Sequence, residues 1–470
     1  MAVSKGIARK LLFLLLAIGV LAGGYFLPAL EGLSEGGKMT LVILLFLFVM
    51  WTGKVMPNWV SAIMGMMMLP FVGAAENMNV VFGNFINSTF FFLLGVFAVA
   101  AAVHKSDLPS RLMVFFIEKF GRDSRKLLFA FAATTWILSA FMSDLASCAI
   151  VAGLAIVLLK DIEFPRSFSK SLMIIIPLAS MCGGITMPIS SATNATIMQK
   201  LAIVTGGDTV SFLAGTVVGL PVALFGLLVT LVSIFCVFKP EPLSDEVMAQ
   251  LQAHFSRNER MSGFDRKVIA LVCLMMVLWI AGTWISALSA AFVALIGMTI
   301  MFLPGIEMLT FDEFRNEVPW DLMVFIGALF SLCQAMVDTG AITWIMESTL
   351  GNTEGWSPTF FVIVASVVLI LIRSALPGGP ILVSLVTPAV LAMGIAFDLD
   401  QMTILMMLSI WGQLNCLVPI LDGQWLMTYN FHYYSTADVM KIGVPIAIAL
   451  TLFTAYVVPM FAGFSFEMLG

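Results

Sequence analysis

The chain has 470 residues, of which 60% are hydrophobic and only 11% are charged. Soluble proteins are about 45–50% apolar, and the mean hydropathy here is +1.05. The composition therefore excludes an ordinary soluble domain and indicates a membrane protein that crosses the bilayer many times. The net charge of −5 comes with no basic tail, so no nucleic-acid partner is expected. Six cysteines lie singly, without the spacing of a metal or redox site.

Apolar segments recur along the chain at about the length of one membrane crossing. We interpret the following eleven as crossings: residues 11–30, 39–53, 57–75, 88–104, 171–199, 212–238, 268–285, 286–304, 321–341, 402–430 and 440–464. Two longer segments, 127–159 and 358–397, carry a polar interruption near their middle. We predict that each forms a re-entrant hairpin, which a bilayer tolerates only where protein or water covers the turn. The predicted class is an all-α polytopic membrane protein.

The positive charges predict the orientation of these segments. With the N-terminus in the cytoplasm, all but three of the 23 Lys and Arg residues face the cytoplasm, as such residues do in membrane proteins. The exceptions are Lys38, Lys200 and Arg373. We therefore predict a multi-pass protein of the inner (cell) membrane with a cytoplasmic N-terminus and an outer C-terminus. Segment 11–30 is interpreted as the first membrane helix and not as a signal peptide.

The same order of segments occurs twice. Each half has three helices, an amphipathic linker, a hairpin, a broken helix and a final helix. The first half begins outside and the second begins inside, so we predict two inverted-topology repeats, a feature of secondary transporters whose site lies at the repeat interface. The predicted divisions are an N-terminal helix at 1–38, a first repeat at 39–238, a cytoplasmic linker at 239–267 and a second repeat at 268–470.

The tip of the first hairpin reads Ser143-Asp144-Leu145. Asp144 is the one acid of that hairpin, and a carboxylate at membrane depth is costly unless it is paired, protonated or bound to a cation. We predict that Asp144 and Ser143 bind the coupling cation or proton. The alternative is that Asp144 forms a structural ion pair or is an acid kept neutral by desolvation.

The tip of the second hairpin runs from Arg373 to Pro380. Its glycines permit close approach of backbone to a ligand, and the planar guanidinium of Arg373 suits a carboxylate or sulfate. The alternative is that Arg373 only neutralises Asp144 across the repeat interface, or extends its side chain to the membrane edge. The substrate-binding residues predicted at the two tips are Ser143, Arg373, Ser374, Gly378 and Gly379.

The broken helices supply the other half of the predicted site. Residues 182–194 combine Gly and Pro with a run of hydroxyl side chains, and residues 413–425 combine amide side chains with a second acid. The residues predicted there are Thr193 and Asn194 for the substrate, and Gly183 and Asp422 for the cation.

Three motifs resemble the divalent anion/sodium symporter family within the ion transporter superfamily, over nearly the whole chain. They are Val318-Pro-Trp-Asp-Leu-Met-Val-Phe-Ile-Gly-Ala-Leu-Phe followed by Asp338-Thr-Gly, Cys182-Gly-Gly-Ile-Thr ending at Asn194, and the segment from Tyr429 to Gly443. The resemblance implies the fold, a homodimer and an elevator-type movement of the hairpin-bearing domain. It also implies Na+ as a coupling ion.

The hairpin tips depart from that family's pattern. The family has Ser-Asn-Thr at both tips, where this chain has Ser143-Asp144-Leu145 and Ser374-Ala375-Leu376. The family's second Thr-Pro-Pro-Asn is replaced by Asp422-Gly-Gln-Trp425. An Asp in place of Asn adds a negative or titrating group, which favours proton coupling or anion exchange.

The leading hypothesis is therefore secondary active transport of a small anion, such as a di- or tricarboxylate, by an elevator mechanism. Transport would be coupled to Na+ or H+, or would exchange anions. No other cofactor is expected. The alternative is a cation/proton antiporter that uses Asp144 and Asp422. Neither a nucleotide-binding motif nor a catalytic Ser/His/Asp set is present, so we predict no enzyme activity. A transport-inactive sensor is a further alternative.

Overall fold

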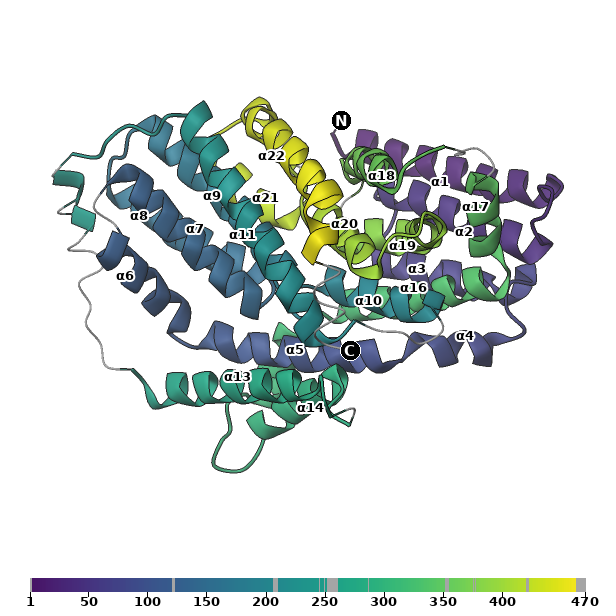
Figure 1. Cartoon of the computed structure of the whole chain (residues 1–470), viewed down its shortest axis with the longest axis horizontal. Helices are drawn as coiled ribbons and strands as arrows, with labels where there is room; N and C mark the ends of the chain where they lie inside the picture. Colours follow the sequence, from purple (N-terminus) through teal and green to yellow (C-terminus); the bar gives the residue numbers. More distant parts are fainter. Residues whose placement is uncertain are drawn as a thin grey trace.

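The structure is a computed structural model. It describes residues 2–120, 123–205, 210–244, 246–248, 250–251, 261–285, 287–350, 355–374, 376, 378–419 and 422–461. Within these ranges every regular element is a helix, which confirms the all-α prediction. The first hairpin and α1 lie at opposite ends of the long axis (Figure 1).

The helices of the first half follow the apolar segments of the sequence. They are α1 (Ala2–Phe26), α2 (Glu35–Thr52), α3 (Asn58–Met68), α4 (Met78–Phe85), α5 (Ser88–Lys105), α6 (Leu108–Phe120), α7 (Ser124–Phe141), α8 (Asp144–Asp161), α9 (Arg166–Ile185), α10 (Ala192–Thr205) and α11 (Phe212–Val237), with a 3-10 turn η1 (Pro70–Val72) after α3.

The helices of the second half repeat that order. They are α13 (Gly263–Ala281), α14 (Ala290–Met301), α15 (Phe311–Glu317), α16 (Trp320–Asp338), α17 (Ala341–Leu350), α18 (Pro358–Arg373), α19 (Gly379–Ala396), α20 (Gln401–Gln413), α21 (Gly423–Tyr429) and α22 (Thr436–Tyr456).

Eight helical spans of the described chain are long and apolar enough to cross a membrane, and three shorter apolar helices accompany them. The chain is thus a polytopic helical membrane protein. The expected number of eleven crossings stays a prediction.

Both predicted hairpins are pairs of packed helices. In the first, α7 packs on α8 and the helix is broken at Met142 and Ser143, whose backbones are extended or nearly so. In the second, α18 packs on α19 and the break lies between Arg373 and Gly379. Gly378 has a φ of 88°, a left-handed conformation that favours glycine. The polar interruptions in the apolar segments therefore coincide with the turns.

Contacts between the two halves occur in exchanged pairs. By chain order, α3, α5, α8 and α10 of the first half correspond to α14, α16, α19 and α21 of the second half. Helix α3 packs on α16, and the corresponding pair α14 and α5 also packs together. Likewise α10 packs on α19, and the corresponding pair α21 and α8 is in contact. Helices α9 and α20 contact each other, as do α11 and α22. An approximate two-fold axis would produce such exchanged contacts. They support the predicted inverted repeats, whose boundaries stay a prediction.

One connection differs from its prediction. The apolar segment 171–199 was expected to end before Lys200, in a connection on the outer side. Instead α10 continues to Thr205, and Lys200 is fully buried. Lys200 is thus part of α10 and is covered by neighbouring helices, and the side of the membrane on which it lies stays a prediction.

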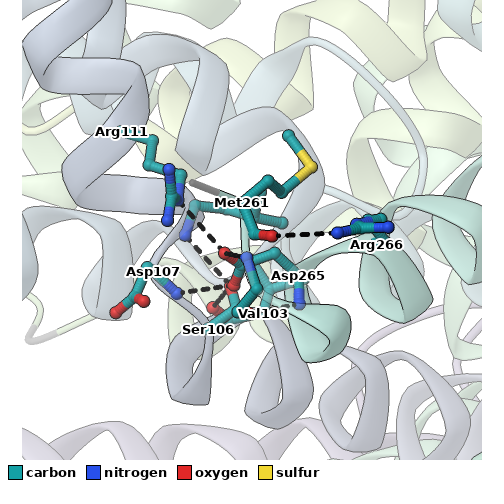
Figure 2. Close-up of polar contacts among 9 residues, drawn as sticks. Val103, Ser106, Asp107, Arg111, Met261, Asp265 and Arg266 are labelled. Carbon is teal, nitrogen blue, oxygen red and sulfur yellow. Dashed lines mark hydrogen bonds and ion pairs between the residues drawn. The ribbon is translucent and has the colours of Figure 1, made fainter. Parts of the chain in front are cut away.

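The buried carboxylate of Asp265, in the first turn of α13, connects this helix to the start of α6. Asp265 is 1% exposed and accepts hydrogen bonds from the Asp107 N–H (3.1 Å) and from Nε of Arg111 (3.1 Å), as Figure 2 shows. Asp265 also forms a capping box with Ser262 at the start of α13. Burial alone would raise the pKa of Asp265, but the hydrogen bonds and the Arg111 charge outweigh it, and the pKa lies below its usual value.

Replacing Asp265 is expected to destabilise the protein. A hydrogen bond to a charged group contributes about 1.5–3 kcal/mol, so Asp265→Asn should lower the free energy of unfolding by about 2 kcal/mol at pH 7. Because the pKa is depressed in the folded state, this contribution is present above the unfolded pKa and is lost as the pH falls below about 4.

Thermal unfolding in detergent measures both effects. Asp107→Asn is the matched control, since it keeps the backbone N–H that Asp265 uses. Equal loss in the two variants would contradict this account. So would a difference between Asp265→Asn and the native chain that does not shrink as the pH is lowered through the acidic range.

Candidate functional site

The broken helices and hairpins end at one cavity of about 250 Å³. Helix α8 begins there at Asp144, α10 at Ala192 and α19 at Gly379, and all three residues line the cavity. Helix N-termini carry partial positive charge and free N–H groups, which favour anions. These three helix ends therefore direct partial positive charge toward the cavity.

The cavity gathers most of the residues that the sequence marks. Those that line it are Ser143, Asp144, Thr193, Arg373, Gly378, Gly379 and Asp422. Gly183, Asn194 and Ser374 are not among the lining residues. The structure thus brings the two hairpin tips and the two broken helices together, as predicted, and leaves three predicted residues in other roles.

Arg373 makes an ion pair within the second half. Its Nη2 lies 2.5 Å from Oδ1 of Asp422, and both side chains are at most 3% exposed. Its Nε donates to the Gly412 carbonyl (3.2 Å) and its Nη1 to that of Leu376 (3.1 Å). The expected alternative of an Arg373 pair with Asp144 is wrong, because Asp422 at the start of α21 takes that position.

Asp144 joins the first hairpin to α21. Its Oδ1 accepts from the Leu145 N–H (2.9 Å), and its Oδ2 accepts from Nε2 of Gln424 (2.9 Å). Hydroxyl groups of Ser147 and Ser180 donate to its backbone carbonyl. The described ion pairs include none with Asp144. Within the described ranges, the carboxylate is therefore held at the cavity by amide groups.

The second acid has one unsatisfied oxygen. Oδ2 of Asp422 is buried and has no hydrogen-bond partner among the described residues. Buried polar atoms are nearly always paired, so this oxygen is suited to a proton or a cation. With Arg373, Asp144 and Asp422 all ionised, the charged lining residues carry a net charge of −1.

The three predicted residues outside the cavity hold the surrounding structure together. Nδ2 of Asn194 donates to the carbonyls of Gly184 (2.8 Å) and Met187 (2.9 Å), and its Oδ1 accepts from Ser409. This side chain bridges the first broken helix and α20. The Ser374 hydroxyl donates to its own helix, at the Ile370 carbonyl (2.8 Å).

Gly183 has a packing role. A Cβ there would press on Ser139 and on the carbonyl of Trp136, so the residue lets α9 approach α7 closely. This geometry therefore does not support direct ligand contact by Asn194, Ser374 or Gly183.

Sequence reasoning missed the apolar wall of the cavity. Leu93, Val96 and Phe97 of α5 and Leu322 of α16 line it opposite the polar tips. The sequence does not distinguish these apolar residues from the lipid-facing or packing residues of other membrane helices, so it could not predict that they line a cavity. Lys200 was also missed as a buried group: its Nζ has no hydrogen-bond partner among the described residues.

The second tip depends on a close backbone approach at Gly379. A Cβ there would press on the Gly412 carbonyl and lie 2.8 Å from Oγ1 of Thr193. We expect Gly379→Ala to lower the free energy of unfolding by about 1–3 kcal/mol, because overpacking against backbone is relieved only by moving it. Gly153→Ala in α8 is the control, since nothing lies within 4 Å of its Cβ. Thermal unfolding should separate the two, and an equally stable Gly379→Ala protein would contradict this packing.

Hairpins and broken helices that end at one cavity inside a helical membrane protein are features of secondary transporters. The family model described as the sodium:sulfate symporter transmembrane region matches residues 8–464. The chain therefore belongs to this family, which confirms the resemblance seen in the sequence.

Two relatives illustrate the family. The chain is 21% identical to a sodium-dependent dicarboxylate transporter of Staphylococcus saprophyticus, over 83% of this chain and 79% of that protein. It is 23% identical to the citrate/succinate antiporter of Escherichia coli K12, over 76% of this chain and 75% of that protein. The family and these relatives are transporters and not enzymes, which confirms the prediction of no enzyme activity.

Solved structures share the fold at low sequence identity. The MtrF efflux pump of Neisseria gonorrhoeae matches with a TM-score of 0.57 and 13% identity, over 97% of this chain and 95% of that chain. The YdaH transporter of Alcanivorax borkumensis matches with a TM-score of 0.54 and 10% identity, over 93% of this chain and all of that chain. At these identities the likeness concerns the fold alone.

Proposed function

We propose that the protein is a secondary active transporter of a small organic anion, a di- or tricarboxylate. The observation that carries this proposal is the convergence of three helix N-termini on one cavity of about 250 Å³. Backbone N–H groups of α8, α10 and α19 would bind carboxylate oxygens, helped by the hydroxyls of Ser143 and Thr193. The relatives that transport dicarboxylate, citrate or succinate support this substrate class.

The two acids are the proposed coupling groups. A dianion that enters a cavity already carrying a net negative charge is repelled unless a cation or a proton enters too. Among the described residues, Oδ2 of Asp422 has no hydrogen-bond partner and the carboxylate of Asp144 accepts only from amide groups. Na+ and H+ are the proposed coupling ions, and anion exchange is the proposed mode when neither is required.

The movement and assembly are proposed from the same features. Arg373, Asp422, Asp144 and Thr193 belong to the hairpins and broken helices, whereas α5 and α16 supply the apolar wall. We propose that the first group moves as one body along that wall, as an elevator, in a homodimer in the inner membrane. The N-terminus would be cytoplasmic and the C-terminus outside.

Counterflow in proteoliposomes tests the proposed function. Vesicles loaded with unlabelled succinate or citrate should take up the labelled anion against its gradient. The same vesicles with sodium removed, and with the pH varied, assign the coupling. Uptake that persists without sodium and without a proton gradient supports exchange, and strict sodium dependence excludes it. Absence of counterflow across a panel of di- and tricarboxylates and sulfate would refute the proposal.

A cation/proton antiporter is the second candidate, favoured by the buried Oδ2 of Asp422, which lacks a partner in the part of the chain that the structure describes. Arg373 would then only balance charge. Proton flux driven by a sodium gradient, with no organic anion present, distinguishes this candidate from an anion transporter.

A further inference from the structure

A second cavity continues the first one toward the surface. It has a volume of about 530 Å³, and three of its lining residues, Leu322, Gly378 and Pro380, also line the central cavity. Its other walls are the connection between α2 and α3 and the first turns of α16. We call this second cavity the Lys54 vestibule; its own lining residues are Lys54, Pro57, Asn58, Trp59, Asp321, Phe325 and Ile381.

A further cavity of the described chain does not border the central cavity directly. A third cavity, of about 500 Å³, lies against α5, α10 and the connection between α13 and α14. It shares no described lining residue with the central cavity. The Lys54 vestibule, by contrast, shares three described lining residues with the central cavity and is therefore a candidate approach to the binding site.

Lys54 is held in an unusual backbone conformation at this vestibule. Its φ is 48°, in the left-handed region that favours glycine, although the neighbouring Gly53 has an ordinary helical conformation. The Lys54 N–H bonds to the Trp51 carbonyl (3.1 Å), so the conformation closes the end of α2. A non-glycine residue in this region is strained, and such strain concentrates at functional sites.

Lys54 and Arg373 are the two described basic residues that line the vestibule and the central cavity, and they differ in their ion pairing. Arg373, the basic residue of the central cavity, already pairs with Asp422. Lys54 is exposed and takes part in none of the ion pairs of the described residues, although Asp321 lines the same vestibule. Among the described residues that line the vestibule, Lys54 alone is basic. An approaching anion therefore meets this unpaired cation before the paired one.

We propose that Lys54 captures the transported anion at the cytoplasmic mouth and steers it past Gly378 and Pro380 into the central cavity. The inference rests on the proposed anion transport. Asp321, on the facing wall, weakens the attraction and so sets how strongly the mouth concentrates anions. Unpaired charge in a low-dielectric cleft raises the local concentration of an oppositely charged solute.

Lys54→Cys tests the capture through its charge. In membrane vesicles of defined orientation, this variant should raise the half-saturation concentration for succinate about fivefold on the cytoplasmic side and leave the outer side unchanged. Modification with a positively charged, membrane-impermeant methanethiosulfonate should restore the native value, and a negatively charged one should not. Asp321→Asn should shift the value in the opposite direction.

Three controls keep the test decisive. The native chain treated with the same reagents accounts for the exposed Cys236 and Cys273. Lys126→Cys places the same reaction at an exposed lysine of α7, away from the vestibule. Lys54→Gly removes the charge but suits the left-handed backbone, so it should unfold at an equal or higher temperature and still show the weaker capture.

The outcomes separate the two proposals. Native counterflow with unchanged half-saturation in Lys54→Cys, or equal rescue by both reagents, overturns the role of Lys54 alone. An effect confined to the outer side overturns the cytoplasmic placement of the mouth. Absence of counterflow in the native chain overturns the anion transport on which this inference rests.

Discussion

Replacing Arg373 by Met is expected to abolish anion counterflow and to destabilise the protein by about 3–5 kcal/mol. The cause is the loss of one partner of a buried ion pair, since Asp422 would keep a desolvated carboxylate with nothing to compensate it. The carbonyls of Gly412 and Leu376 would also lose their donors. Thermal unfolding, with and without succinate or citrate, measures the stability and the protection by ligand together.

The double variant Arg373→Met with Asp422→Asn separates structure from binding. Removing both charges should recover most of the lost stability, because a neutral pair of similar volume replaces the ion pair. Counterflow and ligand protection should stay absent if Arg373 also attracts the anion. A double variant that transports like the native protein would show that Arg373 serves only to balance Asp422. Arg373→Lys keeps the positive charge without the planar guanidinium. This variant should therefore show both lower stability and weaker counterflow than the native protein.

Asp144→Asn is expected to uncouple transport from its driving ion while leaving counterflow intact. Two opposite unit charges 4 Å apart attract by about 4 kcal/mol at an effective dielectric constant of 20, so removing the carboxylate should weaken coupling-ion binding on the order of 100-fold or more. The amide oxygen would still accept from Nε2 of Gln424, which preserves the contact with α21.

The measurement compares accumulation driven by a sodium or proton gradient with counterflow in the same vesicles. Asp338→Asn is the control, because this acid is exposed at the end of α16. If Asp144→Asn still accumulates substrate when a gradient drives it, Asp422 and not Asp144 would be the coupling group. Loss of counterflow together with accumulation would instead make Asp144 part of the anion site.

The positions of the hairpins and broken helices could be predicted because their signals are local. A polar tripeptide such as Ser143-Asp144-Leu145 inside an apolar run marks a helix break wherever it occurs, and Gly378 marks a left-handed turn. The structure places both of these helix breaks at the cavity. The continuation of α10 through Lys200 could not be predicted, because a lysine in a membrane segment is buried only when neighbouring helices cover it.

The ion-pair and hydrogen-bond partners of the charged residues could not be predicted from the local sequence. Arg373 and Asp422 are 49 positions apart, and Asp144 and Gln424 are 280 apart. Either acid suits the arginine chemically, and the packing of α21 against the hairpins decides between them. Asn194 likewise belongs to a polar segment of the predicted kind, yet its side chain faces the turn between α9 and α10 and not the cavity.

A structure determined by electron cryo-microscopy with succinate or citrate present tests the central claim most directly. We predict ligand density in the cavity between Ser143 and Gly379, within hydrogen-bonding distance of the first N–H groups of α8, α10 and α19. Protein that performs counterflow in the same preparation, but binds the anion elsewhere and leaves this cavity free of ligand, would contradict the assignment.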